Sequence, residues 1–410
     1  MRDKALVVAA VTLILAASAW ASSESVLYNF CSQSSCVDGY IPYGSLVADG
    51  LGNLYGTTYY GGANNLGSVF ELTNNKGTWS ETVLYSFTGY NNGDGQNPFS
   101  GLVFDKAGNL YGTTVYGGAS NQGSVFELSN SGGTWKETVL HSFDDISGDD
   151  GYYSYSTLTF DAAGNLYGTT QAGGKFGGGT IFQLKASKGK YTYKVIHGFA
   201  TSSSAAYYPY AGVVVGKNGY LYGTTYYGGV VWNAGAVYQL RQVSGVWIFS
   251  VIYNFLGDSL GQYTESGLAV DAAGNLYGTT YQGGNFNLGS VFELTPGAKN
   301  KWTQKVIYSF KGYASKDGAY PYYAGVTLDA QGNVYGTTYQ GGSSAPNNLN
   351  YGTVYKLTKG TFKESVLWSF GTTGDGYYPY HGVILLNGKL YGTTNNGGVK
   401  GGGVVFEVTP

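Results

Sequence analysis

Few side chains in this chain could act as acids, bases or nucleophiles, and the three histidines are the first to consider. His141 and His197 stand at matching places in two similar segments. We expect them on strands at the rim of the molecule, where they would not converge on one centre. His381, next to Tyr380, is the histidine that could face a central opening. No order of Ser, His and Asp indicates a catalytic triad. The histidines therefore do not predict nucleophilic catalysis.

Carboxylates offer a second kind of chemistry. Asp94, Asp150, Asp317 and Asp375 each precede a glycine, and paired carboxyl groups are what a glycosidase needs. Asp-Gly is also a common turn dipeptide, so a structural role competes with the catalytic one. The acidic run in residues 144–150 lacks the spacing of an EF-hand, which favours a solvated loop over a calcium site. We therefore predict no catalytic residue, no metal site and no cofactor.

A further aspartate recurs before the sequence x-x-Gly-Asn, at Asp49, Asp105, Asp161, Asp271 and Asp329. A ring of carboxylates for a metal or for acid catalysis is one interpretation. The other is that each Asp caps a turn by accepting hydrogen bonds from the backbone ahead of it. Gly216 and Leu386 replace the Asp in two copies, which a structural cap tolerates, so we favour the cap.

The N-terminal residues 1–21 have the features of an export signal. Arg2 and Lys4 precede a short apolar run, and Ala19-Trp-Ala21 forms a cleavage site before Ser22. The apolar run is too short to span a bilayer. In an exported protein the closely spaced Cys31 and Cys36 are expected to form a disulfide, because the pair lacks the further ligands of a zinc site.

Composition excludes two classes of partner. Charged residues make up 11% of the chain and the net charge is −2, so neither a nucleic-acid footprint nor a basic membrane-binding face is present. Glycine (68 residues) and tyrosine (41 residues) dominate instead. The glycines fall mostly in turns between alternating apolar runs, which is typical of an all-β protein.

The chain is organised by a hexapeptide, Asn-Leu-Tyr-Gly-Thr-Thr, that occurs seven times with small variations. Its tyrosines are Tyr55, Tyr111, Tyr167, Tyr222, Tyr277, Tyr335 and Tyr391. A period of this size indicates a repeat architecture. One unit, residues 101–143, contains four short β-rich runs joined by turns, which we name strands a, b, c and d. This is an antiparallel meander of the size of a propeller blade.

The two ends of the repeat array indicate a closed ring. The mature chain would begin with a lone strand d ending at Phe30, and it finishes with a strand c, Val404 to Val408, that has no strand d after it. Together the fragments make one whole blade, and pairing them would remove the exposed edges. We therefore predict that residues 22–410 form one seven-bladed β-propeller, closed by pairing of the N-terminal strand with the C-terminal blade.

The repeat Gly-Leu-x-x-Asp-x-x-Gly-Asn-Leu-Tyr-Gly-Thr-Thr, followed by Gly-Ser-Val-Phe-Glu-Leu, resembles that of the GloVer tandem-repeat family of choice-of-anchor proteins. The resemblance covers residues 24 to 410. The Asp-x-x-Gly-Asn-Leu-Tyr portion is also similar to NHL-type propeller repeats, although the following Gly-Thr-Thr departs from them. The resemblance implies an exported bacterial protein and carries over no catalytic residues.

One face of the propeller should be rich in tyrosine. In a propeller the d-to-a links and the b–c loops emerge on the same face, and here both carry tyrosine with glycine, Asn and Gln. Such a surface suits stacking against sugar rings, with hydrogen bonds at the rim, or a protein partner. The alternative is that these tyrosines fill the wedge between blades. The candidate ligand-binding residues are Tyr59, Tyr60, Tyr116, Tyr226, Tyr227, Tyr281, Tyr339, Tyr152, Tyr153, Tyr207, Tyr208, Tyr322, Tyr377 and Tyr378.

These features predict a monomeric, secreted or periplasmic, non-catalytic propeller that binds a neutral polysaccharide or a protein. Two alternatives stay open. One is an enzyme acting on polysaccharide with acidic residues at the channel mouth, and the other is a purely structural component of the envelope or matrix.

Overall fold

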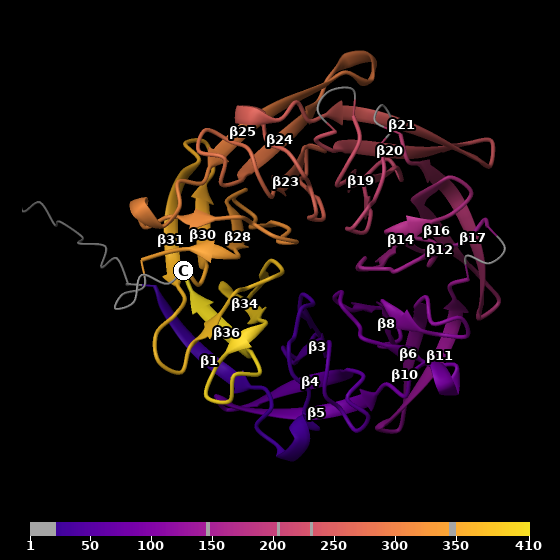
Figure 1. Ribbon diagram of the computed structural model, residues 1–410, viewed down its shortest axis with the longest axis vertical. Helices are drawn as coiled ribbons and strands as arrows, with labels where there is room; N and C mark the ends of the chain where they lie inside the picture. Colours follow the sequence, from indigo (N-terminus) through magenta and orange to yellow (C-terminus); the bar gives the residue numbers. More distant parts are fainter. Residues whose placement is uncertain (1–21, 145–147, 203–205, 230–232, 344–349) are drawn as a thin grey trace, which may run out of the picture.

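The computed structural model describes residues 22–410 except 145–147, 203–205, 230–232 and 344–349. The predicted signal peptide lies outside the described residues. The described chain folds into a ring of seven antiparallel blades (Figure 1). The seven-bladed β-propeller predicted from the repeats is therefore confirmed.

Each blade contains strands a, b, c and d, which follow one another along the chain in the first six blades, and neighbouring strands are paired. The first blade contains β2 (Val47–Ala48), β3 (Leu54–Thr58), β4 (Ser68–Asn75) and β5 (Thr78–Ser86). The second contains β7 (Val103–Phe104), β8 (Leu110–Thr114), β10 (Ser124–Ser131) and β11 (Thr134–Ser142). The third contains β13 (Thr159–Phe160), β14 (Leu166–Thr170), β16 (Gly177–Ser187) and β17 (Lys190–Ala200).

The remaining blades repeat this pattern. The fourth contains β18 (Val214–Val215), β19 (Leu221–Thr225), β20 (Ala236–Val243) and β21 (Val246–Asn254). The fifth contains β22 (Ala269–Val270), β23 (Leu276–Thr280), β24 (Ser290–Pro296) and β25 (Trp302–Ser309). The sixth contains β27 (Thr327–Leu328), β28 (Val334–Thr338), β30 (Thr353–Thr358) and β31 (Lys363–Ser369). The seventh contains β33 (Ile384–Leu386), β34 (Lys389–Thr394), β36 (Val404–Thr409) and, from the other end of the described chain, β1 (Ser23–Asn29).

The seventh blade closes the ring. Strand β1 pairs antiparallel with β36, with Val26 opposite Phe406 and Asn29 opposite Val404. Phe30, which follows β1, is fully buried and packs edge-on against Phe70 of the first blade. The first described strand thus supplies strand d of the last blade, as the complementary ends of the repeat array predict.

Strand b is the hexapeptide strand, and its five residues are buried in every blade. Its central glycine is required by packing. A Cβ atom at Gly56 would lie 2.6 Å from Cζ of Phe70, and one at Gly223 would lie 2.3 Å from the hydroxyl of Tyr238. The aromatic residue of strand c therefore occupies the space over this glycine.

The first threonine after this glycine links adjacent blades. Its hydroxyl donates to the backbone carbonyl at the start of the next blade's inner strand, over distances of 2.8–3.1 Å. The seven threonine links join Thr57 to Ser100, Thr113 to Ser156, Thr169 to Ala211, Thr224 to Ser266, Thr279 to Ala324, Thr337 to His381 and Thr393 to Gly44. The last of these joins the seventh blade to the first, so the hydrogen bonds run around the whole ring.

The recurring aspartate before x-x-Gly-Asn is a structural cap. Oδ1 of Asp49 accepts hydrogen bonds from the backbone N–H groups of Leu51 and Asn53, and Oδ2 accepts from Asn53 Nδ2 and the Tyr55 hydroxyl. Asp105, Asp161, Asp271 and Asp329 repeat this arrangement. The capping interpretation made from the sequence is confirmed.

Candidate functional site

The d-to-a links and the b–c loops share one face of the ring, as predicted. In every blade the link pairs with the b–c loop of the same blade through a short ladder or an isolated bridge. The ladders join β6 (Gly95–Gln96) to β9 (Tyr116–Gly117), β12 (Gly151–Tyr152) to β15 (Ala172–Gly173), β26 (Gly318–Ala319) to β29 (Gln340–Gly341) and β32 (Gly376–Tyr377) to β35 (Asn396–Gly397). The bridges join Tyr40 to Tyr60, Tyr207 to Tyr227 and Gln262 to Gln282.

One residue in each link is held in the left-handed backbone region, with φ between 55° and 62°. Its N–H group donates to the b–c loop of the preceding blade, and its carbonyl accepts from the b–c loop of its own blade. Bulky residues rarely adopt this conformation, and it persists only where the surroundings fix it. These residues are Ile41, Asn97, Tyr153, Tyr208, Tyr263, Tyr320 and Tyr378. The links are therefore anchored on both sides.

Each link then places one side chain at the centre of the face, and we call these seven residues the channel ring. They are Tyr43, Phe99, Tyr155, Tyr210, Glu265, Tyr323 and Tyr380. Each directly precedes the carbonyl that receives the threonine link, so the hydrogen bonds that join the blades also position the ring.

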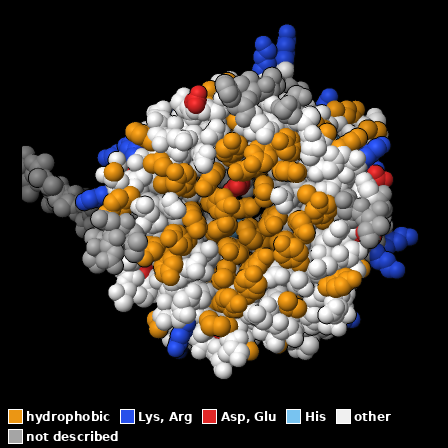
Figure 2. Space-filling view, in the orientation of Figure 1, with side chains coloured by type: hydrophobic (Ala, Val, Ile, Leu, Met, Phe, Trp, Pro, Cys, Tyr) orange, Lys and Arg blue, Asp and Glu red, His pale blue; other side chains and the backbone are white. Residues whose placement is uncertain are grey.

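The aromatic members of the channel ring touch one another. Tyr43 lies 4.8 Å from Phe99 and 4.7 Å from Tyr380, measured between ring centroids. Phe99 lies 5.0 Å from both Tyr155 and Tyr323. These spacings are typical of edge-to-face and offset-stacked aromatic pairs. Figure 2 shows hydrophobic and tyrosine side chains gathered across the centre of the molecule, while Lys and Arg lie at its edge.

Glu265 is the exception among the seven. It is 5% exposed, and its Oε2 atom has no hydrogen-bond partner among the described residues. Burial raises the pKa of this carboxyl group well above its usual range. Its charge in turn helps to raise the pKa of Tyr210, Tyr226 and Tyr322, after the larger effect of their own burial. A buried acid of this kind holds its proton more tightly than an exposed glutamic acid does.

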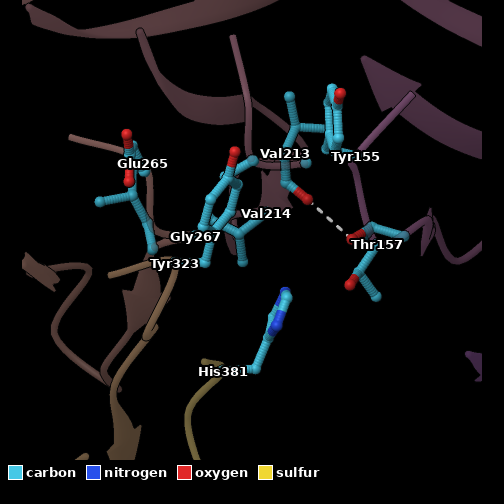
Figure 3. A pocket seen from close by; sticks show the side chains of 12 residues that line it. Tyr155, Thr157, Val213, Val214, Glu265, Gly267, Tyr323 and His381 are labelled. Atoms are coloured by element: carbon cyan, nitrogen blue, oxygen red, sulfur yellow. Dashed lines mark hydrogen bonds between the residues drawn. The ribbon is translucent and has the colours of Figure 1, made fainter. Parts of the chain in front are cut away.

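A cavity of about 190 Å³ adjoins the channel ring. Figure 3 shows Tyr155 and Thr157 on one side of this cavity, Glu265 and Tyr323 on the opposite side, and the His381 ring pointing between them. Burial lowers the pKa of His381 to about 4, so this imidazole is neutral at physiological pH. His381, the histidine that the sequence allowed to face a central opening, lines this cavity, whereas His141 and His197 are not among its lining residues.

The predicted tyrosines lie around the channel ring rather than in it. Tyr59, Tyr116, Tyr153 and Tyr322 belong to the same aromatic cluster as the ring. Others form pairs next to it, including Tyr339 with Tyr378 at 4.7 Å. Still others lie in the link–loop pairs, among them Tyr60, Tyr152, Tyr207, Tyr208, Tyr226, Tyr227, Tyr281 and Tyr377.

The channel ring itself was not among the predicted site residues. Its signal is positional, because each member stands three residues before the Leu or Val that directly precedes the inner strand, for example Phe99 before Leu102. Within runs of adjacent tyrosines, composition alone does not distinguish this position from its neighbours. Glu265 does not share the aromatic character of the other six.

The Asp-Gly carboxylates do not line the channel. Asp94 accepts hydrogen bonds from the hydroxyl of Tyr85 on the outer strand β5 and from the backbone and side chain of Thr88. Asp317 accepts likewise from Tyr308 and Lys311, and Asp375 from Trp368 and Gly371. The suggestion that these groups supply catalytic carboxylates around the channel is wrong, because each one fixes a turn near the outer strand.

His141 and His197 lie on neighbouring outer strands and, contrary to the expectation, border the same surface groove. His141 stacks on Tyr193 at 3.5 Å, and its Nε2 lies 2.7 Å from Oδ2 of Asp150. His197 stacks on Phe249, and burial lowers its pKa to about 4. The groove lies at the rim and is separate from the channel ring.

The predicted disulfide between Cys31 and Cys36 is present. It closes the loop that follows β1, where Asp38 accepts hydrogen bonds from the backbone N–H groups of Ser32 and Gln33. No helix among the described residues is long and apolar enough to cross a bilayer.

The model of the Gloeobacter/Verrucomicrobia repeat matches residues 20–233 and 212–410. The chain belongs to this family. The two matches together cover the whole propeller, in agreement with the resemblance noted from the hexapeptide. No curated protein matches the chain.

Solved structures that resemble this repeat protein are distant in sequence. A candidate 6-phosphogluconolactonase from Bacteroides uniformis is 14% identical, with a TM-score of 0.50 over 82% of this chain and 85% of that one. A protein from Lactobacillus plantarum is 13% identical, with a TM-score of 0.50 over 80% and 84%. At these identities the likeness shows the propeller fold alone.

Proposed function

We propose that this repeat protein is an exported, non-catalytic binding propeller that holds a neutral polysaccharide against its tyrosine face. Export to the periplasm or the medium rests on the signal-like residues 1–21. The observation that carries the binding proposal is the set of tyrosines around the channel ring, which the links hold in place.

Rigidity supports this proposal. Tyr226 contacts Tyr210, Tyr227 and Tyr263 at centroid distances of 5.4, 4.4 and 5.0 Å. Its backbone N–H donates to the carbonyl of Tyr208, the left-handed residue of the link. Aromatic side chains fixed in this way lose little conformational entropy when a ligand stacks on them.

The chemistry of the face suits an uncharged ligand. Burial raises the pKa of Tyr210 to about 12 and that of Tyr59 further still, so these hydroxyl groups stay neutral. Gln171 Nε2 donates to the Tyr210 hydroxyl at 2.7 Å, which shows that amide and phenol groups already pair on this face. Sugar hydroxyls would find similar donors and acceptors there.

Hydrolysis of a polysaccharide fits the site less well than binding. A glycosidase requires two carboxyl groups on either side of the scissile bond. Among the described residues that line the channel cavity, Glu265 is the one carboxylic acid. The lactonase named among the similar structures shares the fold at low identity and gives no reason to assign its reaction here.

The test is electrophoresis of residues 22–410 through gels that contain neutral polysaccharides. We expect at least one polysaccharide to retard the protein. The double variant Tyr226→Ala/Tyr227→Ala should weaken this retention by about tenfold or more, because stacked rings contribute on the order of 0.5–1.5 kcal/mol each. Tyr226→Phe, which keeps the ring, should retain most of the binding.

Tyr220→Ala is the matched control, because Tyr220 lies in the a–b turn of the fourth blade, on the opposite face. Its retention should equal that of the unmodified protein. Equal retention of the Tyr226/Tyr227 variant, or migration unaffected by every polysaccharide, would argue against the tyrosine face as a glycan site.

A further inference from the structure

The channel ring departs from its repeat at two neighbouring places. Glu265 takes the fifth position, which is aromatic in the other six blades. In the sixth blade the link has one additional residue, and Tyr322 precedes the ring residue Tyr323. Tyr322 lies 5.0 Å from Tyr281 and 4.8 Å from Tyr380. The extra aromatic ring and the single acid therefore belong to the same side of the channel ring.

Glu265 lacks the interactions that normally accompany a buried carboxyl group. Its Oε2 atom is buried without a hydrogen-bond partner, and no Lys, Arg or His forms an ion pair with it among the described residues. In contrast, five aspartates of the d-to-a links each accept several hydrogen bonds, namely Asp38, Asp94, Asp150, Asp317 and Asp375. Four outer-strand glutamates of the described chain also have an unpaired buried oxygen, but Glu265 alone among these acids lines the channel cavity, where a partner from outside the chain can offset the cost of burying it.

Most titratable groups near Glu265 are tyrosines. Tyr210, Tyr226, Tyr227, Tyr281, Tyr322 and Tyr323 lie close enough for its charge to affect their pKa values. His381 lies on the same cavity and is neutral at physiological pH. The faces of aromatic rings carry negative potential and attract organic cations, most strongly where water is excluded.

We propose that Glu265 and the tyrosines around it form a binding site for an organic ammonium group. The adjoining cavity of about 190 Å³ has room for a compact ligand, since a cavity of about 150 Å³ holds benzene. The site shares Tyr226 and Tyr227 with the proposed glycan surface but is centred on Glu265, and the proposal stands whether or not a polysaccharide binds there.

At a pH below the pKa of Glu265, binding of the cation displaces a proton. The carboxylic acid of Glu265 gives its proton to the solvent, and the carboxylate that remains pairs with the ammonium group. A quaternary ammonium ion does not titrate, so below the pKa of Glu265 its affinity should rise about tenfold for each unit of pH. A purely hydrophobic ligand would show no such dependence.

Calorimetric titration of residues 22–410 with choline tests the proposal. We expect binding at about pH 8 that is tighter than at about pH 6. The measured heat should change with the ionisation heat of the buffer in the amount expected for release of about one proton. The isosteric variant Glu265→Gln should lose this proton release and bind at least about tenfold more weakly.

Two controls make the result specific. Dimethylbutanol, the uncharged carbon isostere of choline, should bind far more weakly than choline. Glu137→Gln removes another acid with a buried carboxyl oxygen, on the outer strand β11, and should leave choline binding unchanged. Equal binding of choline and its isostere, unchanged binding to a folded Glu265→Gln variant, or no binding of choline at either pH would overturn the proposal.

Discussion

In four blades, a glutamate on the outer strand lies near an aspartate of a d-to-a link. Glu24, Glu81, Glu137 and Glu364 occupy the same position on the outer strand, and each has a buried Oε1 atom without a hydrogen-bond partner among the described residues. Burial raises the pKa of the first three to about 8 and that of Glu364 to about 7. A link aspartate adds to each shift by charge repulsion, as Asp94 does for Glu137.

These acids predict that stability falls as the pH rises. Their pKa values in the folded protein exceed the ordinary value of a glutamic acid, so the folded state binds more protons than the unfolded state at intermediate pH. The contribution to stability is fully present below about pH 4.5 and is lost as the pH rises through 7–8. Differential scanning calorimetry of residues 22–410 should therefore show a melting temperature that declines over this range.

Replacement of one such glutamate should make the melting temperature fall less steeply as the pH rises. Gln304 occupies the equivalent position in the fifth blade, so Glu137→Gln is a substitution that the repeat already accommodates. We expect this variant to melt close to the unmodified protein at about pH 5 and several degrees above it at about pH 9. A variant whose melting temperature differs by the same amount at both values would show that Glu137 is not protonated in the fold.

At the scale of elements, the hexapeptide strand connects packing to the site. Its glycine makes room for the aromatic residue of strand c, and its first threonine binds the carbonyl next to a channel-ring residue. One short strand thus packs the blade, joins it to the next blade and places one side chain at the channel mouth. Recurrence of the whole hexapeptide follows from these combined requirements.

Removal of one threonine hydroxyl should loosen one blade junction. Thr224→Val keeps the shape of the side chain and leaves the buried carbonyl of Ser266 without its hydrogen bond. We expect a loss of about 1–3 kcal/mol in the free energy of unfolding, measured by urea denaturation. Thr224→Ser, which retains the hydroxyl, should lose less than Thr224→Val. Equal losses in the two variants would assign the effect to packing rather than to the hydrogen bond.

The candidate site was predicted only in part, because the structure of the links and the b–c loops determines which side chains reach the channel. The sequence shows that tyrosines gather in the links and b–c loops, and the topology then places them on one face. Which tyrosine of a run such as Tyr207 to Tyr210 enters the channel ring depends on the left-handed turn at Tyr208, and that turn follows from pairing with two loops. The sixth link is one residue longer than the others, so its ring residue Tyr323 follows the left-handed residue Tyr320 by three positions instead of two. Glu265, as one acid among tyrosines, carries no local signal.

At the scale of the whole molecule, the fold could be predicted almost completely. Seven copies of one strand and two complementary ends leave a closed ring as the arrangement that pairs every edge. The ring then determines which loops share a face. What the repeat could not show was the arrangement at the centre, where the seven copies meet and where small differences between them matter most.

Closure of the ring by β1 is the claim on which the site depends, because the threonine links and the channel ring form one circle. Its most direct test compares two rearranged proteins by thermal unfolding and by the polysaccharide gel. Deletion of residues 22–30 removes β1 and leaves β36 without its outer partner. A circular permutant that joins Pro410 to Ser22 and opens at the exposed turn between Gly132 and Gly133 again splits a blade between strands c and d, as the native chain does.

We predict that the permutant melts near the native protein and keeps any polysaccharide retention of the native protein, whereas the deletion variant melts well below the native protein. A deletion variant that melts and binds like the native protein would contradict the account.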